Sequence, residues 1–331
     1  MRLKIAFMPN PRHEPLRDGT IQLDGVELDW ELGNPGALFA RHLREDAFDV
    51  FEFSISNYFI LRARPDWAHR HWIAIPTFIA KPLFIFRNFH VNTGAGISSL
   101  ADLRGKRIGL PDYGMTAAVW LRIILRVLYG IRAPELTWVN GRVASGRHTR
   151  ILGIEATPPP GVTIVNLDEH DGTALNAMLA RGEVDAAIGD NQIMPITEGP
   201  TVRKLFRPDT LASVPAALYR ETGVTPVNHV LVLQQALDAE HPDLARTLYD
   251  AFERSKQEAY ARAQRAAPGY WLFPEALIHE QTAVFGADPY PSGLKANRRM
   301  LAMVAEQLVI DGFIPAVPDI DALFAGSVRD L

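Results

Sequence analysis

Short apolar runs alternate with amphipathic segments along most of the chain. Apolar and acidic residues alternate strictly over residues 26–32, the pattern of a strand with one buried face. Residues 230–233 instead form a continuous apolar run, which is typical of a strand covered on both faces. On these patterns we predict strands at residues 3–7, 26–32, 48–54, 72–75, 83–87, 107–110, 137–140, 162–167, 184–189 and 229–233.

Helical spacing appears between these runs. Within residues 115–128, Trp120, Ile123, Ile124 and Val127 line one side of a helix, because residues three and four apart share a helix face. We predict helices at residues 36–44, 115–128, 173–180, 242–262 and 294–310. Alternation of strands and helices predicts an α/β fold with largely parallel sheets.

Two stretches repeat one order of elements. Residues 43–50 and residues 179–186 each have the pattern of a helix end, a tight turn and an aspartate that enters a strand. One such turn is common in any α/β protein and carries little information. Two copies, in a chain whose 331 residues suffice for about two domains, indicate two lobes built alike.

Composition narrows the class of protein. The chain has no cysteine, which excludes disulfides, thiolate zinc sites and cysteine nucleophiles. A net charge of −4 argues against a nucleic-acid partner, and no apolar run reaches the ~20 residues of a membrane span. The first residues enter a strand pattern without a signal-peptide core, so we expect a cytoplasmic protein, although a secreted chain given a new initiator Met has the same appearance.

A resemblance to known proteins rests on several motifs. Residues 99–111 resemble the D-L-x-G-K-R-[IV]-G-[VL] signature that opens the second lobe of type II periplasmic-binding-protein folds. Over residues 3–315 the chain resembles the 4,5-dihydroxyphthalate decarboxylase family, an enzyme branch on that scaffold. The stretches that carry this resemblance are residues 48–54, 111–122, 138–141, 219–230 and 293–298.

The resemblance implies a two-lobed type II periplasmic-binding-protein-like fold with a ligand cleft between the lobes. Lobe 1 is expected to be discontinuous, with residues 1–90 and 218–331, and lobe 2 to hold residues 91–217. Crossing segments near residues 87–91 and 215–219 are expected to act as hinges.

The start of the 115–128 helix is a candidate anion site. Its free N–H groups and positive dipole end attract a carboxylate, Tyr113 offers an aromatic wall, and Met115 and Thr116 lie at the opening. The alternative is an ordinary helix start capped by Asp112.

Two further candidates suit proton transfer. Glu52 interrupts an apolar strand, so its carboxylate is either paired structurally or held for proton transfer. His229 precedes the 230–233 run, and an imidazole suits proton delivery near neutral pH, although a structural role is the alternative. Ser54 and Ser56 follow the Glu52 strand, where they either contact the ligand or cap the next helix.

The remaining candidates are ligand-binding residues. Asp190 and Asn191 end a second-lobe strand and either face the cleft or cap a turn. Arg12 and Arg147 are candidate carboxylate binders because a guanidinium makes bidentate contacts. Arg147 lies in residues 141–150, a basic segment after a strand that is either a cleft loop or a surface loop.

These features lead to one function hypothesis and two alternatives. The resemblance implies a cofactor-independent, metal-free decarboxylase of a hydroxylated aromatic (di)carboxylate, which converts 4,5-dihydroxyphthalate to protocatechuate and CO2 in phthalate degradation. His229 is the expected general acid, Glu52 its partner or the base for a substrate hydroxyl, and residues 113–116 with Arg147 the carboxylate binders. The alternatives are a non-catalytic solute-binding protein or ligand sensor, and a related enzyme with another substrate. We expect a small aromatic carboxylate as the partner and consider a homo-oligomer possible.

Overall fold

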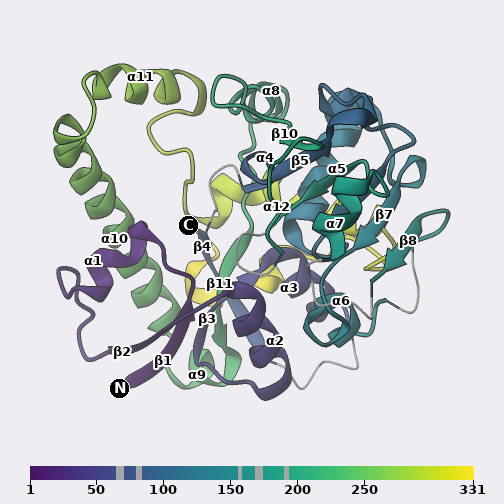
Figure 1. Ribbon diagram of the computed structural model, residues 1–331. Helices are drawn as coiled ribbons and strands as arrows, with labels where there is room; N and C mark the ends of the chain where they lie inside the picture. Colours follow the sequence, from purple (N-terminus) through teal and green to yellow (C-terminus); the bar gives the residue numbers. More distant parts are fainter. Residues whose placement is uncertain (65–70, 80–83, 156–158, 168–173, 190–193) are drawn as a thin grey trace.

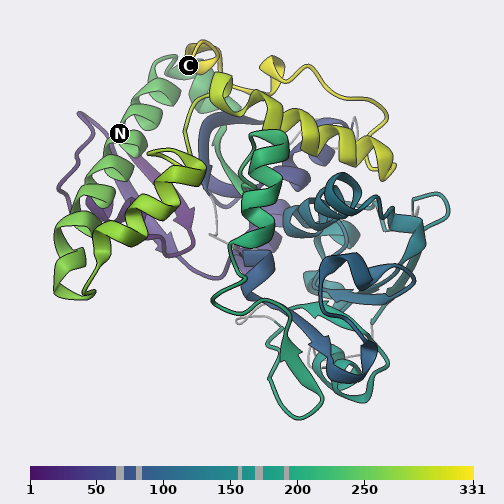
Figure 2. The same cartoon turned by 90° about the horizontal axis from the view of Figure 1, so that it is seen from above.

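Two mixed sheets with helices packed on them form the molecule, seen in a computed structural model (Figures 1 and 2). The structure describes residues 1–64, 71–79, 84–155, 159–167, 174–189 and 194–331. The α/β prediction is confirmed. No helix within these ranges is both long and apolar enough to cross a bilayer.

The first sheet has five strands in the order β2-β1-β3-β11-β4. These strands are β1 (Arg2–Phe7), β2 (Glu27–Leu32), β3 (Val50–Ser54), β4 (Trp72–Ile79) and β11 (His229–Gln234). β1 pairs in parallel with β2 and β3, whereas β11 runs antiparallel to both β3 and β4. A strand from late in the chain therefore lies between two strands from its beginning.

The second sheet has six strands in the order β10-β5-β9-β6-β7-β8. They are β5 (Phe89–Asn92), β6 (Arg107–Leu110), β7 (Thr137–Asn140), β8 (Thr163–Asn166), β9 (Ala186–Ile188) and β10 (Val202–Lys204). β9, β6, β7 and β8 are parallel, and β5 is antiparallel to β9 and β10. The sheets are thus largely parallel, as predicted, except where β11, β5 and β10 enter them.

Helices cover both sheets. The α-helices are α1 (Glu14–Arg17), α2 (Pro35–Glu45), α3 (Ile55–Arg62), α4 (Phe84–Arg87), α5 (Thr116–Tyr129), α6 (His148–Ile151), α7 (Ala174–Arg181), α8 (Ser213–Thr222), α9 (Gln235–Glu240), α10 (Leu244–Ala266), α11 (Pro274–Phe285) and α12 (Leu294–Ile310). Short 3-10 turns lie at Pro11–His13, Thr93–Ala95, Leu100–Leu103, Ala133–Glu135, Ala144–Gly146, Ala267–Gly269, Asp321–Leu323 and Gly326–Val328.

One prediction of local structure is wrong. Residues 84–87 of the strand expected at 83–87 form α4, and β5 begins two positions later, because an unbroken apolar run carries no period that separates helix from strand. The crossing segment expected near residues 215–219 lies inside α8, and its role as a hinge stays a prediction. Pro215 sits in the first turn of that helix, where its missing N–H removes no helical hydrogen bond.

α5 contacts helices from the N-terminal and from the C-terminal part of the chain. It is buried on every side from Thr116 to Leu125 and packs against both α3 and α12. Arg122 of α5 pairs with Asp311, the residue that ends α12, through N–O distances of 2.7 and 2.9 Å, and both side chains are almost completely buried. Trp120 donates to the Val227 carbonyl just before β11. α12 belongs to the expected lobe 1 and α5 to the expected lobe 2. Contacts between these helices do not define where one lobe ends, so the lobe boundaries at residues 90 and 218 stay a prediction.

We expect Arg122→Met to lower the free energy of unfolding by about 3–5 kcal/mol, because it leaves the Asp311 carboxylate buried without its partner. Arg298→Met is the matched control: it breaks the exposed pair with Asp321 and is expected to cost less than about 1 kcal/mol. Urea denaturation of the three proteins measures both changes. Equal losses in the two variants would contradict the assignment of Arg122–Asp311 as the pair that secures α5.

Candidate functional site

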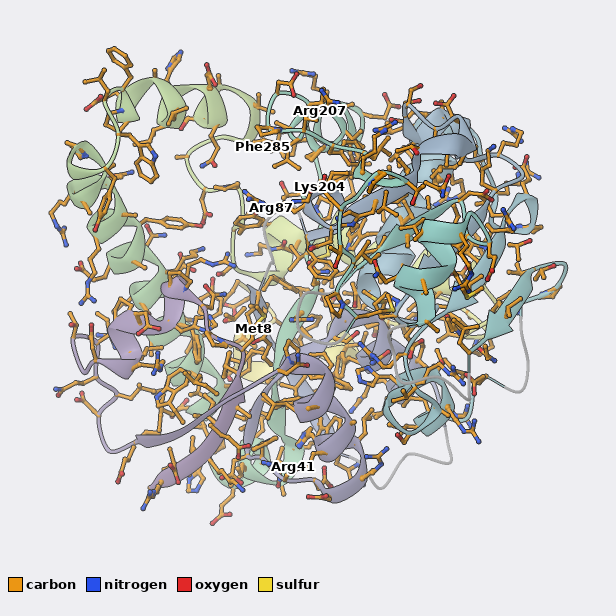
Figure 3. All side chains as sticks on the ribbon, in the orientation of Figure 1. Met8, Arg41, Arg87, Lys204, Arg207 and Phe285 are labelled. Atoms are coloured by element: carbon orange, nitrogen blue, oxygen red, sulfur yellow. The ribbon has the colours of Figure 1, made fainter. Side chains whose placement is uncertain are left out.

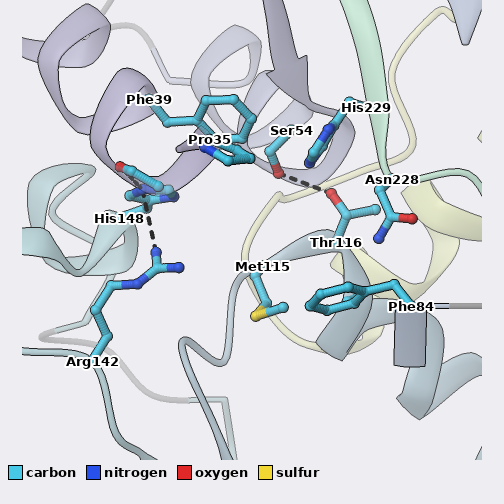
Figure 4. A pocket seen from close by; sticks show the side chains of 12 residues that line it. Pro35, Phe39, Ser54, Phe84, Met115, Thr116, Arg142, His148, Asn228 and His229 are labelled. Atoms are coloured by element: carbon cyan, nitrogen blue, oxygen red, sulfur yellow. Dashed lines mark hydrogen bonds between the residues drawn. The ribbon is translucent and has the colours of Figure 1, made fainter. Parts of the chain in front are cut away.

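A small cavity of about 50 Å³ lies where the first sheet meets the start of α5 (Figure 4). The first turns of two helices, α2 and α5, face it, and the end of β3 and the start of β11 form another wall. The residues that line it are Pro35, Gly36, Phe39, Ser54, Phe84, Met115, Thr116, Ala117, Arg142, His148, Asn228 and His229.

A carboxylate–imidazole pair lies at the strand wall. Antiparallel pairing sets His229 opposite Ser54 and Leu231 opposite Glu52, so Glu52 and His229 are diagonal neighbours on one face of the sheet. The His229 Nδ1 lies 2.5 Å from Glu52 Oε1, and the Met8 N–H donates to the other carboxylate oxygen over 3.0 Å. Glu52 is buried, and His229 is slightly exposed to the cavity.

The geometry of this pair determines what the imidazole can do. Because Nδ1 donates to the carboxylate, Nε2 is the ring nitrogen that remains for chemistry in the cavity. A carboxylate behind the ring fixes its orientation and determines which ring nitrogen faces the cavity. The structure therefore brings together the two residues that the sequence analysis selected for proton transfer.

A cluster of three hydroxyls joins the ends of two helices. Ser54 lies 2.8 Å from Thr116 and 3.2 Å from Ser56, oxygen to oxygen. Ser56 also donates to the Gly114 carbonyl, and the Ser56 N–H donates to the Thr116 hydroxyl. Ser54 caps α3, as one alternative proposed, while Ser54 and Thr116 also line the cavity. Ser56 supports them from behind.

The turn before α5 depends on a glycine. A Cβ at Gly114 would lie 2.5 Å from the Thr149 methyl carbon, so a side chain there would force the turn and α6 apart. Asp112 accepts from the N–H groups of Gly114 and Thr149, and Met115, the N-cap residue, makes no side-chain capping bond. The alternative of Asp112 as the cap of α5 is therefore wrong, and Met115 and Thr116 face the cavity.

A buried imidazole and a guanidinium form the opposite wall. His148 Nδ1 lies 3.0 Å from the Asn57 side-chain amide, and Nε2 lies 3.2 Å from the Gly36 carbonyl oxygen and 3.3 Å from the Arg142 guanidinium. Burial, and then the charge of Arg142 3.3 Å from Nε2, lower the pKa of His148 to about 4. Arg142 supplies a positive charge to the cavity while His148 stays neutral.

Other predicted ligand residues lie elsewhere. Arg147 is fully buried, pairs with Glu155 and donates to the Arg142 carbonyl, so it supports Arg142 rather than lining the cavity. Tyr113 is buried behind α5, where the Arg122 guanidinium lies 3.8 Å from its ring centre. Arg12 stacks on Tyr290 at 4.9 Å, away from the cavity.

Two predicted residues, Asp190 and Asn191, lie outside the described residues. In the part of the chain that the structure describes, no three carboxylate, imidazole or thiol side chains converge on a metal-sized site. The expectation of a reaction without metal or cofactor stays a prediction.

The sequence analysis did not select three of the polar wall residues, Arg142, His148 and Asn228. Arg142 and His148 belong to the basic segment that it singled out, but Arg147 was preferred within that segment. Asn228 had a visible signal, because it directly precedes His229.

Comparisons with known proteins agree with this architecture. A 4,5-dihydroxyphthalate decarboxylase of Comamonas testosteroni is 33% identical over 304 residues, which cover 91% of this chain and 89% of that protein. A protein of the same name from Pseudomonas putida is 36% identical over 209 residues, or 62% of this chain and 78% of its own length. The periplasmic aliphatic sulphonate binding protein SsuA of Escherichia coli shares the fold, with a TM-score of 0.54 at 14% identity over 98% of this chain and 91% of its own. The expected periplasmic-binding-protein-like fold is confirmed. No protein-family model matches the chain.

The pKa of His148 predicts a pH dependence of stability. Because the folded pKa of about 4 lies below the unfolded value of 6.5, the folded state takes up the proton less readily. The stabilisation is complete above pH 6.5 and is lost as the pH falls toward 4. We expect wild type to lose about 3 kcal/mol more than His148→Asn over this range, from urea denaturation at several pH values. Parallel curves for the two proteins would contradict the assignment.

Proposed function

Because this chain belongs to the 4,5-dihydroxyphthalate decarboxylase family, we propose that it removes CO2 from a hydroxylated aromatic carboxylate in this cavity. The model substrate is 4,5-dihydroxyphthalate and the product is protocatechuate. The observation that carries the assignment of the reaction to this cavity is the buried Glu52 carboxylate bonded to His229 at its wall.

The substrate supplies its own electron sink. A hydroxyl para to the leaving carboxylate lets the ring accept a proton at the carbon that bears the carboxylate, with loss of the hydroxyl proton. This gives a ketone-like intermediate. The bond to the carboxylate then breaks, CO2 leaves, and the electron pair of that bond restores the aromatic ring and the phenol oxygen. One proton is consumed for each CO2 released.

We assign the proton donor to His229. Its Nδ1 bond to Glu52 leaves Nε2 for the substrate carbon, and the Glu52 carboxylate stabilises the imidazolium that must form before each transfer. The Met8 N–H holds the second Glu52 oxygen, so the carboxylate cannot turn away from the ring. Glu52 thus acts through His229.

We assign binding of the substrate carboxylate to Arg142 and to the start of α5. Support comes from Arg142, whose guanidinium suits a carboxylate, and from the start of α5, whose positive dipole end faces the same space. This assignment replaces Arg147 with Arg142, because the Arg147 side chain is committed to Glu155.

The cavity must widen for a ring to enter. A benzene ring occupies a cavity of roughly 150 Å³, against the observed 50 Å³. A larger cavity of about 560 Å³ between α4, α8 and α11 shares Phe84 and Asn228 with the site. Rotation of the Phe84 side chain would join the two spaces, and we propose this as the route of entry. The cytoplasmic location stays a prediction.

Release of CO2 from 4,5-dihydroxyphthalate tests the function directly. We expect protocatechuate and CO2 in equal amounts, measured by chromatography of the product and by trapping of the released CO2. A panel of other hydroxylated benzoates and phthalates defines the substrate range. A ligand that binds and is recovered unchanged, with no CO2 from any member of the panel, would favour a solute-binding protein instead.

Variants of Glu52 and His229 at the strand wall and of Arg142 at the opposite wall are expected to change different kinetic constants. Glu52→Gln and His229→Gln are expected to lower kcat by roughly 10²–10⁴-fold, because proton delivery is lost. Arg142→Met is expected to raise KM by about 10–100-fold, because a charged hydrogen bond to the substrate is lost.

An exposed pair provides the matched control for these variants. Glu240 and His241 also form a carboxylate–imidazole contact, but on the surface of the molecule. Glu240→Gln and His241→Gln are expected to leave kcat and KM unchanged. The double variant of Glu52 and His229 is expected to lose little more than either single variant, because the two residues act as one unit. Additive losses would contradict the proposed pair.

A further inference from the structure

The segment that follows α10 runs from the end of that helix to α8, and we call its residues 267–285 the arm (Figures 1 and 2). It comprises the 3-10 turn Ala267–Gly269, the tip at residues 270–273 and α11. The tip residues Tyr270, Trp271, Leu272 and Phe273 are all exposed, with Leu272 83% and Tyr270 80% accessible. Four consecutive large apolar side chains in water are unusual for a chain that acts alone.

α11 itself has little support from the rest of the chain. Residues 275–283, nine in succession, are exposed, and they include Leu277 and Ile278. At the C-terminal end of the helix, Phe285 packs edge-on against Tyr219 of α8, with 5.3 Å between the ring centres. A helix of 12 residues is marginal in water without tertiary packing. Its apolar residues therefore indicate a covering partner.

The size of the patch fits a contact between two proteins. At about 200 Å² for a large side chain, the exposed parts of the tip residues with Ile278 amount to roughly 650 Å². A standard interface buries about 800 Å² on each partner. The same patch on two copies thus approaches the area that a stable dimer needs.

We propose that the arm binds the arm of a second copy of this chain about a two-fold axis. Residues 266–274 carry no charge, so two tips meet without repulsion. Arg265 precedes the tip and Glu275 follows it, so two copies in opposite orientation bring unlike charges together. Acidic residues beside the tip disfavour a membrane surface, which selects Lys and Arg.

Self-association through the arm would also affect the proposed route of substrate entry. α11 lines the 560 Å³ cavity through Leu277, Val284 and Phe285, and Arg87 lines the same cavity (Phe285 and Arg87 are labelled in Figure 3). That cavity borders the site at Phe84 and Asn228. A partner that holds α11 in place therefore fixes one wall of the route to the site.

The mass in solution tests the proposal. We expect wild type to be a dimer or a multiple of it by light scattering after gel filtration, and Trp271→Glu/Phe273→Glu to show half that mass with an unchanged circular dichroism spectrum. Val317→Glu, which places the same charge on an exposed valine elsewhere, is the control and is expected to keep the wild-type mass. A monomeric wild type, or a double variant that keeps the wild-type mass, overturns the proposal.

A cross-link provides a test that does not depend on dissociation. The chain has no cysteine, so Leu272→Cys introduces a single thiol. Near a two-fold axis this thiol meets its own copy, and mild oxidation is expected to give a covalent dimer, whereas Val317→Cys is expected to stay monomeric on a denaturing gel. Equal cross-linking of the two variants overturns the proposal. So does a monomeric wild type that sediments with phosphatidylcholine–phosphatidylglycerol vesicles, since a membrane is then the partner of the arm.

Discussion

Hydrogen bonds between β3 and β11 join two segments that are far apart in the sequence, and the site depends on that register. Glu52 and His229 lie 177 positions apart along the chain, yet the antiparallel pairing sets their side chains on one sheet face within bonding distance. A shift of one residue would turn one of them to the other face of the sheet. The apolar neighbours of both residues, buried on both sides of the sheet, hold the register in place.

α5 connects this strand pair to the second sheet. Its first turn supplies Thr116 to the hydroxyls of Ser54 and Ser56, and its middle supplies Arg122 to the buried pair with Asp311. The same helix therefore carries one wall of the cavity and a bond that anchors it to the C-terminal part of the chain. The wall of the proposed substrate cavity and a buried ion pair of the fold therefore belong to one helix.

The local sequence was sufficient to predict most strands. It was also sufficient to select Glu52 and His229 as candidate residues, because a carboxylate inside an apolar strand and a histidine before one can be recognised without a structure. It selected the segment of residues 141–150 but preferred Arg147 to Arg142. That choice depended on Glu155, a tertiary partner that takes up one guanidinium, and spacing along the chain does not reveal it. The same limit applies to α4 and β5, where an apolar run folds into two different elements.

The place of β11 in its sheet also has a consequence for synthesis of the chain. β11 lies between β3 and β4, so a ribosome that has released residues only up to 228 leaves the edges of both strands unpaired. The second sheet draws all its strands from residues 89–204 and is complete by then. The second sheet is thus complete in the emerging chain before the first one closes, and for that interval the edges of β3 and β4 that pair with β11 are exposed and prone to aggregation.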